Sequence, residues 1–395
     1  MQLNNSSYEV LYPAIEKMKA EVKQVNVVFL LTHVPNPRIN KRIEVFKNIA
    51  DTRVICTRRA SQNIWEPSQN VEHIIFDIDL PSAKHIVKRY VISRVFQEKA
   101  IEKLEQIQPN IIYAEGLDSL IIAGKYKKKH FVRVFFEVAD LRENYIVKPK
   151  KLVDCIITNV LLSKEKNAFK NVDYLVVTSP KFYDMHYNTL ISKERMLFIP
   201  NVPDIDIFKA YKKKTGGRFT VGFIGGIRYL KQMKMLVDVA TSVDCDVLFA
   251  GAGGTSKEYD EIRRYCEGMS NVIFTGRYDY NKEIAGLYSR VDCVFSVYDA
   301  DNPNVRIALP NKLYESIYCK LPIIVAKETY LEELVEEWGV GIAVGHDKAE
   351  ELVYALKELK ENNLFYQKIS IACEQKRKDL FEIEDKERLG SLINN

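Results

Sequence analysis

The chain has 395 residues, of which 47% are hydrophobic and 28% charged, a composition that excludes a disordered or fibrous protein. This length exceeds what a single hydrophobic core usually supports, so two domains are expected. The formal net charge of +5 is mild, and the lysine clusters are not interleaved with aromatic residues as in nucleic-acid-binding modules. Nucleic acid is therefore not an expected partner.

The seven cysteines are scattered without a C-x-x-C pair, which indicates reduced thiols and no zinc site. The first 22 residues are polar and charged where a signal peptide needs an apolar run. No stretch approaches the roughly 18 apolar residues of a spanning helix. We expect a cytoplasmic protein, at most in contact with the inner face of the cell membrane. Lysine clusters at 125–130, 148–151 and 212–214 are either solvated surface or contacts for anionic lipid or a polyanionic acceptor.

Short apolar runs alternate with longer amphipathic runs through the first 200 residues. Strands are expected at 25–31, 54–56, 73–76, 111–113, 131–138, 174–178 and 196–199. Helices are expected at 38–49, 84–107, 117–126 and 150–169. This alternation predicts parallel strands joined by right-handed helical crossovers.

Residues 201–218 interrupt the pattern with Pro203, three consecutive lysines and two glycines, which predicts an exposed linker. The alternation then restarts. Strands are expected at 219–224, 246–249, 272–274, 293–297 and 323–325, and helices at 230–241, 256–266, 281–288, 311–318, 331–336 and 349–361.

The sequence thus predicts two α/β, Rossmann-like, doubly wound domains that face a central cleft. The expected divisions are an N-terminal domain at 1–200, a linker at 201–218, a C-terminal domain at 219–364, and a helical tail at 365–395 that packs back on the first domain. Ligands of such sheets bind beyond the carboxyl ends of the strands.

A strand, a glycine turn and a helix follow one another in VGFIGGIRYLKQ, residues 221–232. Gly225 and Gly226 let a ligand approach the backbone, and the helix N-terminus offers free N–H groups. Arg228 and Lys231 add positive charge, which favours a diphosphate site. The alternative is a tight packing turn with solvated cations.

A second candidate site lies in NPNVRIALPNKLYESIYCKLPIIV, residues 302–325. After the proline, a helix presents Asn311, Lys312 and Glu315 about one turn apart, so that all three can face one ligand. The carboxylate can accept ribose hydroxyls while the lysine faces phosphate. The alternative is an ordinary lysine–glutamate pair on a helix surface.

At these residues the sequence resembles the family 4 glycosyltransferases, which have the GT-B fold. Further segments match in the expected order: MLFIPNV (196–202), VLFAGAGG (247–254), NVIFTGR (271–277) and SRVDCVFSVY (289–298). The resemblance is strong in the C-terminal half and loose in the N-terminal half.

The resemblance implies a nucleotide-sugar donor bound in the C-terminal half. It places Arg228 and Lys231 on the donor diphosphate, Glu315 on the nucleotide ribose, and Arg277 and Tyr278 where backbone groups read the base.

The family's first E-x7-E acid, which usually touches the donor sugar, falls on Ile307 and is absent. Asn304, Arg306 or the backbone near Ala308 and Leu309 are the substitutes that the sequence offers.

In the N-terminal half, His33, Arg38 and Arg42 follow the first strand and match the acceptor-side loop of the resembling family. Glu137 and Asp140 end another strand near the family's catalytic centre, and the spacing lets them share one face. The alternatives are a loop histidine with satisfied hydrogen bonds, and acids that serve as helix caps or in loop hydrogen bonding.

The function implied is transfer of a sugar from a nucleoside diphosphate to a saccharide or lipid-linked acceptor, in cell-surface polysaccharide synthesis. Arg228 and Lys231 would stabilise the leaving group, with Asp140 and Glu137 near the reacting centre. Retention of configuration is expected. No cofactor or metal is expected, because no D-x-D motif is apparent in a suitable loop. A UDP-sugar is the first expected donor and a GDP-sugar the second.

Two alternatives stay open from the sequence. One is a nucleotide-sugar epimerase of the GT-B type. The other is a non-catalytic scaffold that binds a nucleotide sugar, which the missing acid at Ile307 permits. The donor sugar, the acceptor and the oligomeric state are not predicted.

Overall fold

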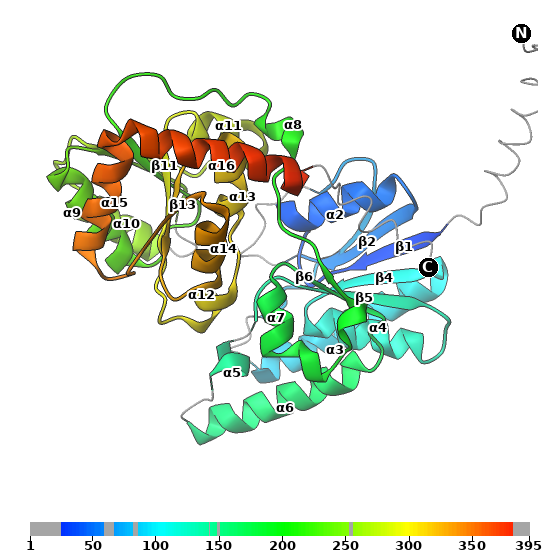
Figure 1. The fold of residues 1–395 in the computed structure, drawn as a ribbon. Helices are drawn as coiled ribbons and strands as arrows, with labels where there is room; N and C mark the ends of the chain where they lie inside the picture. The colour runs from blue at the N-terminus through cyan, green and yellow to red at the C-terminus, as the bar shows by residue number, and fades with distance from the viewer. Residues whose placement is uncertain are drawn as a thin grey trace, which may run out of the picture. The chain divides into compact units, whose positions relative to one another are not determined.

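The computed structural model describes residues 25–58, 67–81, 86–141, 143–147, 151–252 and 256–381 (Figure 1). Two separate sheets organise the chain, and their strand pairs are parallel. Contacts divide it into two compact units. The first holds the described residues up to Glu137 together with Lys164–Leu175, and the second holds Val138–Ser163 and the described residues from Val176 onwards. The predicted fold class, two doubly wound α/β sheets, is confirmed.

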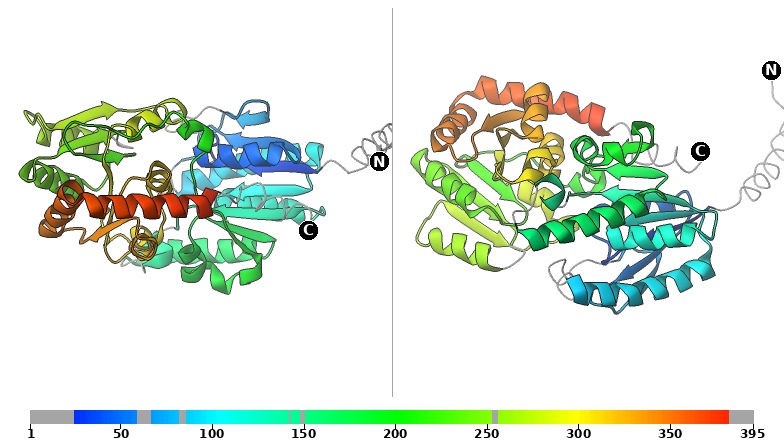
Figure 2. Two further views of the ribbon diagram at one scale, coloured as in Figure 1. Left: turned by 45° about the horizontal axis from the view of Figure 1, so that its top comes forward. Right: turned by 90° about the horizontal axis from the view of Figure 1, so that it is seen from below.

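The first sheet has the strand order β3-β2-β1-β4-β5-β6-β7. Its strands are β1 (Asn26–Leu30), β2 (Asp51–Thr57), β3 (Glu72–Phe76), β4 (Ile111–Glu115), β5 (Arg133–Val138), β6 (Tyr174–Val177) and β7 (Met196–Phe198). Its main helices are α2 (Pro37–Lys47), α3 (Ile86–Ile107), α4 (Leu117–Lys127) and α6 (Leu152–Phe169). Helix α2 covers one face, while α3 and α4 pack together on the other (Figures 1 and 2). The strand order reverses between β1 and β4, where ligands of such sheets bind.

The second sheet has the strand order β10-β9-β8-β11-β12-β13. Its strands are β8 (Thr220–Ile224), β9 (Asp246–Ala250), β10 (Val272–Gly276), β11 (Cys293–Ser296), β12 (Ile323–Ala326) and β13 (Gly341–Val344). Its main helices are α9 (Leu230–Ser242), α10 (Ser256–Tyr265), α11 (Tyr280–Tyr288), α13 (Asn311–Cys319), α14 (Tyr330–Trp338), α15 (Ala349–Glu361) and α16 (Asn363–Phe381). The reversal between β8 and β11 places the ends of these two strands at the candidate binding edge.

Several short elements were not predicted from the sequence. They are α5 (Glu143–Ile146), α7 (Pro180–Met185), α8 (Ile205–Phe208), α12 (Pro303–Ile307), the 3₁₀ turns Tyr187–Thr189 and Lys193–Arg195, and strand β13. Each helix among them has six residues or fewer. Such a length is too short for an apolar period of 3.6 residues to be visible.

Most residues of 201–218, predicted as an exposed linker, are exposed, but the segment is also anchored by two side chains. Phe208 in α8 is 1% exposed, and its ring packs 5.7 Å from that of Tyr288 and 5.4 Å from that of Tyr318. Lys214 Nζ lies 2.5 Å from Asp292 Oδ2 and 3.0 Å from the Thr220 hydroxyl. An aromatic anchor and a partly buried ion pair thus fix this segment to the second unit.

Helix α16 packs against α13, α14 and α15 of the second unit. The rest of the predicted tail, residues 382–395, lies outside the described residues, and so does Lys84 at the start of the predicted helix 84–107. Among the residues that the structure describes, no helix is both long and apolar enough to cross a membrane.

Candidate functional site

The glycine turn after β8 lies directly against the ammonium group of Lys312. Gly225 has φ +143°, and a Cβ built on it would lie 2.8 Å from Lys312 Nζ. On the other side, a Cβ on Gly251 would lie 2.1 Å from the Gly225 carbonyl oxygen. The backbone is therefore closely packed here and adopts a conformation that favours glycine. The structure thus brings the glycine turn of residues 221–232 into contact with Lys312, which belongs to the second candidate segment, residues 302–325.

Lys312 is a nearly buried cation, and no acid of the described residues lies within ion-pair distance of its ammonium group. Its residue is 7% exposed, and Nζ donates a 2.7 Å hydrogen bond to the Tyr298 hydroxyl. The same atom lies 4.5 Å from the centre of the Phe223 ring. No acidic side chain of the described residues forms an ion pair with Lys312. Because burying an unpaired charge is costly, this arrangement favours an anionic ligand at the Gly225 turn.

Glu315 lies one turn further along α13 and is held by two tyrosines of α11. It is 3% exposed. The Tyr280 hydroxyl donates to Oε1 at 2.7 Å, and the Tyr288 hydroxyl donates to Oε2 at 2.6 Å. A carboxylate offers about four acceptor positions, so positions beyond those two bonds remain for ligand hydroxyls. Glu315, the residue predicted to bind the ribose, is thus held in place by two residues of a second helix.

Burial raises the pKa of Glu315, while hydrogen bonds from Tyr288 and Tyr280 and the charge of Lys312 act in the opposite direction. Burial and the charge of Glu315 in turn raise the pKa of Tyr278. Tyr278, predicted near the nucleotide base, is therefore electrostatically coupled to Glu315. Arg277, the other residue predicted there, is exposed just after β10.

Asn311 does not share the buried side of Lys312 and Glu315. It is exposed, and its Oδ1 accepts a 2.5 Å hydrogen bond from Asn201 Nδ2. Asn311 is thus separated from the two buried side chains, and that Lys312 and Glu315 face one ligand stays a prediction. Asn311 instead ties the start of α13 to Asn201, in the segment MLFIPNV (196–202).

The remaining cations of the glycine turn are open to solvent. Gly226 and Arg228 are exposed, and α9 starts at Leu230, as predicted. The Lys231 side chain is 71% exposed, with Nζ 3.9 Å from Asp347 Oδ2. Such exposed groups can reorient toward a ligand at low cost, in contrast to Lys312.

Asp140 lies within electrostatic range of this same turn. Burial raises the pKa of Tyr229, which immediately precedes α9, and the nearby Tyr298 and Asp140 raise it further while Arg228 lowers it. Asp140, predicted as a catalytic residue, and Arg228 thus both lie within electrostatic range of Tyr229.

The substitutes predicted for the missing acid are mostly engaged within the protein. The Asn304 side chain accepts a hydrogen bond from the Leu141 N–H at 3.1 Å and donates one to the Leu141 carbonyl at 2.5 Å. Arg306 Nε donates to the Ala300 carbonyl at 2.6 Å. The Ala308 N–H donates to the Asn304 carbonyl at 2.9 Å. Neither side chain replaces the acid without breaking these bonds.

A D-x-D sequence is present in the loop after β11, contrary to the prediction that no suitable loop carries one. Asp299, Asp301 and His346 place three potential ligand atoms within 4.8 Å of one another. His346 Nδ1 lies 3.2 Å from Asp299 Oδ1. These side chains could hold a divalent cation, so metal independence needs a direct measurement.

The predicted acceptor-side residues form a buried charged network in the first unit. Arg38 pairs with Glu115, and its Nε lies 3.2 Å from Glu137 Oε1. His33 Nδ1 donates to the Val34 carbonyl at 2.8 Å, and its Nε2 lies 3.3 Å from Glu115 Oε2. These groups meet at the carboxyl ends of β1, β4 and β5.

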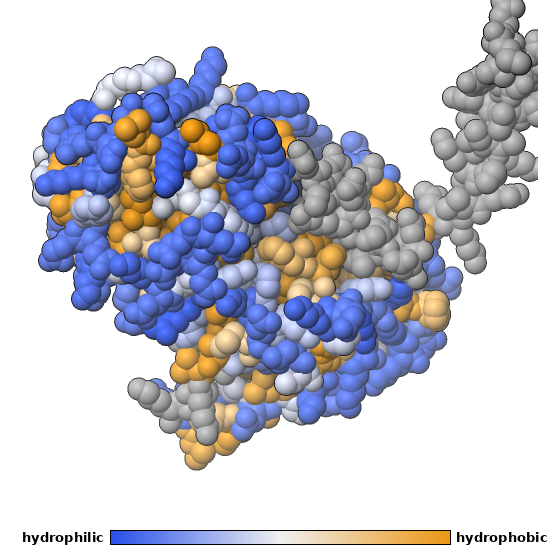
Figure 3. Space-filling view, in the orientation of Figure 1, coloured by the Kyte–Doolittle hydropathy of each residue, from blue (hydrophilic) through white to orange (hydrophobic). Residues whose placement is uncertain are grey.

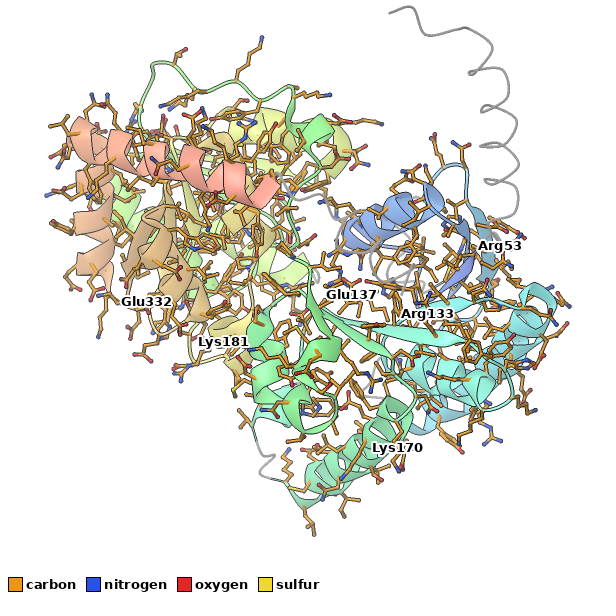
Figure 4. All side chains as sticks on the ribbon, turned by 45° about the vertical axis from the view of Figure 1, so that its right-hand side comes forward. Arg53, Arg133, Glu137, Lys170, Lys181 and Glu332 are labelled. Atoms are coloured by element: carbon orange, nitrogen blue, oxygen red, sulfur yellow. The ribbon has the colours of Figure 1, made fainter. Side chains whose placement is uncertain are left out.

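Glu137 is fully enclosed in this network. It lies near one end of β5, and Arg133 lies at the other end of the strand (Figure 4). Glu137 Oε2 accepts a 2.5 Å hydrogen bond from the Tyr113 hydroxyl and lies 3.8 Å from Arg42 Nε. Glu137 lies within β5, whereas Asp140 follows the end of the strand, so alternation along the strand does not reach both residues. Hydrogen bonding within the fold, the alternative open from the sequence, describes Glu137.

We predict that Glu115→Gln destabilises the protein in a pH-dependent manner. Burial opposes ionisation of Glu115, but Arg38 and His33 outweigh it and hold its pKa down, at about 2. A depressed carboxyl pKa stabilises the fold above the unfolded value of about 4.3, and that stability is lost as the pH falls toward 2. Urea unfolding should show a loss of about 3 kcal/mol at pH 6, and about half of that at pH 3.

The control for this prediction is Glu72→Gln. Glu72 is 62% exposed and pairs with Arg53 at 3.0 Å on the surface. Such a pair contributes less than about 1 kcal/mol. A pH-independent loss in Glu115→Gln would mean that its charge does not stabilise the network.

Four aromatic residues around the site were missed by sequence reasoning: Phe223, Tyr280, Tyr288 and Tyr298. They come from β8, α11 and the loop after β11, and the chain separates them from Lys312 and Glu315 by 14 residues or more. Spacing along one helix cannot reveal such partners. The available signal was the concentration of tyrosines just after the ends of β10 and β11.

Comparison with known proteins agrees with this geometry. Residues 218–362 match the family described as Glycosyl transferases group 1. O-antigen chain mannosyltransferase C from Escherichia coli is 27% identical over 139 residues, which are 33% of this chain. The aligned part spans 35% of that relative, so the match covers about a third of each protein.

Two solved structures show the same fold over nearly the whole chain. Sucrose-phosphate synthase from Thermosynechococcus elongatus has a TM-score of 0.73 at 14% identity, covering 94% of this chain and 98% of its own. HepE from Anabaena, solved in complex with UDP-glucose, has a TM-score of 0.70 at 15% identity, covering 94% of this chain and 100% of its own. The molecule is a GT-B-fold protein. Within its C-terminal half, residues 218–362 are similar to the glycosyl transferases group 1 family, in agreement with the resemblance seen in the sequence.

Proposed function

We propose that the protein is a glycosyltransferase that moves a sugar from a nucleoside diphosphate to a hydroxyl group of a saccharide or lipid-linked acceptor. The observation that carries this proposal is Lys312, a nearly buried cation that forms no ion pair with the described acids and lies against the Gly225 turn. A diphosphate at this turn would compensate the lysine charge, and Glu315 on the same helix has acceptor positions for ribose hydroxyls. The family match over residues 218–362 supports the assignment.

In the proposed reaction, the sugar–phosphate bond breaks, the acceptor oxygen forms a bond to the same carbon, and the proton of the acceptor hydroxyl passes to an oxygen of the leaving diphosphate. The leaving nucleoside diphosphate gains negative charge, which Lys312, Arg228, Lys231 and the N–H groups at the start of α9 would stabilise. We propose that the configuration is retained and that no metal is required. Adding EDTA tests the second point directly, because Asp299, Asp301 and His346 could bind a cation.

The donor is proposed to be a UDP-sugar first and a GDP-sugar second. The Anabaena protein of the same fold was solved with UDP-glucose, and the E. coli relative is named as a mannosyltransferase of O-antigen chains. These names favour a role in cell-surface polysaccharide synthesis. We propose that the protein acts in the cytoplasm, at the inner face of the cell membrane.

A thermal-shift screen of UDP- and GDP-sugars, followed by a transfer assay, tests the proposal. The true donor should raise the melting temperature by mass action, and labelled sugar should appear in product only when an acceptor is added. Isomerisation of the donor without acceptor would instead identify an epimerase, an activity known for a protein of the same fold, UDP-N-acetylglucosamine 2-epimerase (TM-score 0.57). Binding without turnover on a full acceptor panel would support the non-catalytic scaffold.

A further inference from the structure

The ammonium group of Lys312 is covered by aromatic rings instead of water. The surface of the second unit is largely hydrophilic on the face drawn in Figure 3, where polar and charged side chains face solvent. Lys312, by contrast, is 7% exposed, and its Nζ lies 4.5 Å from the centre of the Phe223 ring and 5.3 Å from that of the Tyr298 ring. Because aromatic rings attract a cation, these two rings hold the ammonium group beside the Gly225 turn.

The hydrogen bond between Lys312 and Tyr298 has a fixed direction. An ammonium group has three donors and no acceptor, so in the 2.7 Å contact Nζ donates and the Tyr298 hydroxyl oxygen accepts. The hydroxyl proton of Tyr298 must therefore point away from Lys312. Within the part of the chain that the structure describes, no residue accepts this proton.

The tyrosine hydroxyls beside Glu315 are used differently. The Tyr280 and Tyr288 hydroxyls donate to the Glu315 carboxylate at 2.7 and 2.6 Å, so their protons are engaged within the protein. Tyr298 is half-buried, and its O–H group remains available to a ligand. Since its hydroxyl oxygen lies 2.7 Å from the ammonium group of Lys312, one anionic ligand could accept hydrogen bonds from both residues.

Two neighbouring rings fix the orientation of the Tyr298 side chain. The Tyr229 ring lies 5.3 Å from the Tyr298 ring, and the Phe223 ring meets the Tyr298 ring edge-on at 6.3 Å. Tyr229 has φ 56° and ψ 58°, the left-handed region that residues other than glycine seldom adopt. Residues held in such a conformation concentrate at ligand sites. The backbone at Tyr229 thus supports the interpretation that the Tyr298 hydroxyl is held in place for a ligand.

We propose that Tyr298 is a further ligand-binding residue of the donor site, whose hydroxyl donates a hydrogen bond to an oxygen of the donor diphosphate. This inference rests on the proposed function and adds a neutral donor to the charged groups named there. Lys312 donates to the same hydroxyl, which polarises the O–H bond and strengthens the hydrogen bond to the diphosphate. The proton stays on Tyr298, and the hydrogen bond becomes stronger as the leaving diphosphate gains charge.

Calorimetric titration of the full chain with UDP tests this proposal. Tyr298→Phe keeps the ring that covers Lys312 and removes only the hydroxyl. Since a hydrogen bond to a charged group is strong, the affinity for UDP should fall about 10- to 100-fold. The affinity for uridine, which has no phosphate, should not change. If GDP is the nucleotide that binds, GDP and guanosine replace UDP and uridine.

The same substitution in a Lys312→Met background separates direct contact from positioning. If Tyr298 acted only by holding Lys312, removing its hydroxyl would have no further effect once the lysine is gone. If the hydroxyl contacts the diphosphate, the double variant should bind UDP at least about fivefold more weakly than Lys312→Met alone.

Tyr366→Phe is the matched control. The Tyr366 hydroxyl, on α16, donates a 2.8 Å hydrogen bond to the Asp292 carbonyl. Asp292 precedes β11, whereas Tyr298 follows it, so the control removes a hydrogen bond of similar length at the other end of the strand. This variant should melt at a lower temperature and still bind UDP as the wild type does. Circular dichroism checks the fold of every variant.

Two outcomes would overturn the proposal. One is an affinity for UDP that Tyr298→Phe leaves unchanged. The other is a loss that disappears in the Lys312→Met background, which would make Tyr298 a positioning residue for the lysine alone. In both cases the wild type binds the nucleotide, so the proposed function stands. Failure of the proposed function is recognised differently: the wild type would bind neither UDP nor GDP, and the role of Tyr298 would fall with it.

Discussion

Replacing Lys312 with methionine is expected to reduce sugar transfer by about 100- to 1,000-fold without unfolding the protein. The ammonium group lies against the Gly225 turn and is the nearly buried positive charge of the candidate site. Methionine keeps a long apolar stem for packing on Phe223 and Tyr298 but removes the charge that would stabilise the leaving diphosphate. Steady-state kinetics with a saturating acceptor measures the loss.

A second measurement separates a ligand-binding role of Lys312 from a structural one. Because no acid of the described residues forms an ion pair with this lysine, Lys312→Met should melt at the same or a higher temperature than the wild type when no nucleotide is present. The increase in melting temperature caused by UDP or GDP should be much smaller in the variant. Lys282→Met, at an exposed position on α11, is the matched control. Unchanged turnover, or a melting temperature many degrees lower without nucleotide, would contradict the assignment.

Much of the fold could be predicted because buried parallel strands are short, continuous apolar runs between longer amphipathic segments. Strand β8 is buried along its whole length, and it was predicted to within one residue. Strand β13 was missed because it begins with glycine and is only four residues long. Its glycine has a tertiary reason, since a Cβ on Gly341 would lie 1.9 Å from the Ile323 carbonyl oxygen. Contacts of this kind are invisible to a local pattern.

The candidate site was predicted where its geometry is local and missed where it is not. The three-residue spacing of Lys312 and Glu315 correctly indicated that both lie on the same side of α13. The same reasoning could not show that Glu315 is held by tyrosines 27 and 35 residues earlier in the chain. For Glu137, the sequence indicated a carboxylate near the end of a strand, but only its partners on β4 and α2 show that the carboxylate is enclosed.

Replacing Glu315 with glutamine is expected to weaken nucleotide binding about 10- to 100-fold, because hydrogen bonds to a charged group contribute about 1.5–3 kcal/mol. The sharper test is discrimination between UDP and 2′-deoxy-UDP, measured by calorimetry. If the carboxylate accepts the ribose hydroxyl, the wild type should prefer UDP by about tenfold or more, and Glu315→Gln should lose most of that preference. If GDP proves to be the preferred nucleotide, the same comparison uses GDP and its 2′-deoxy form.

Tyr280→Phe and Tyr288→Phe are the controls, since each removes one hydrogen bond to Glu315 and leaves the carboxylate in place. Both variants should lower stability yet keep the preference for the ribose hydroxyl. If the role of Glu315 were purely structural, Glu315→Gln would behave like these two variants. The pH dependence gives an independent check. Burial raises the pKa of Glu315, and the ionised form is the better acceptor, so nucleotide affinity should fall on acidification at a higher pH than for an ordinary glutamate. This acid limb should be absent in Glu315→Gln, and its persistence there would assign the pH dependence to another group.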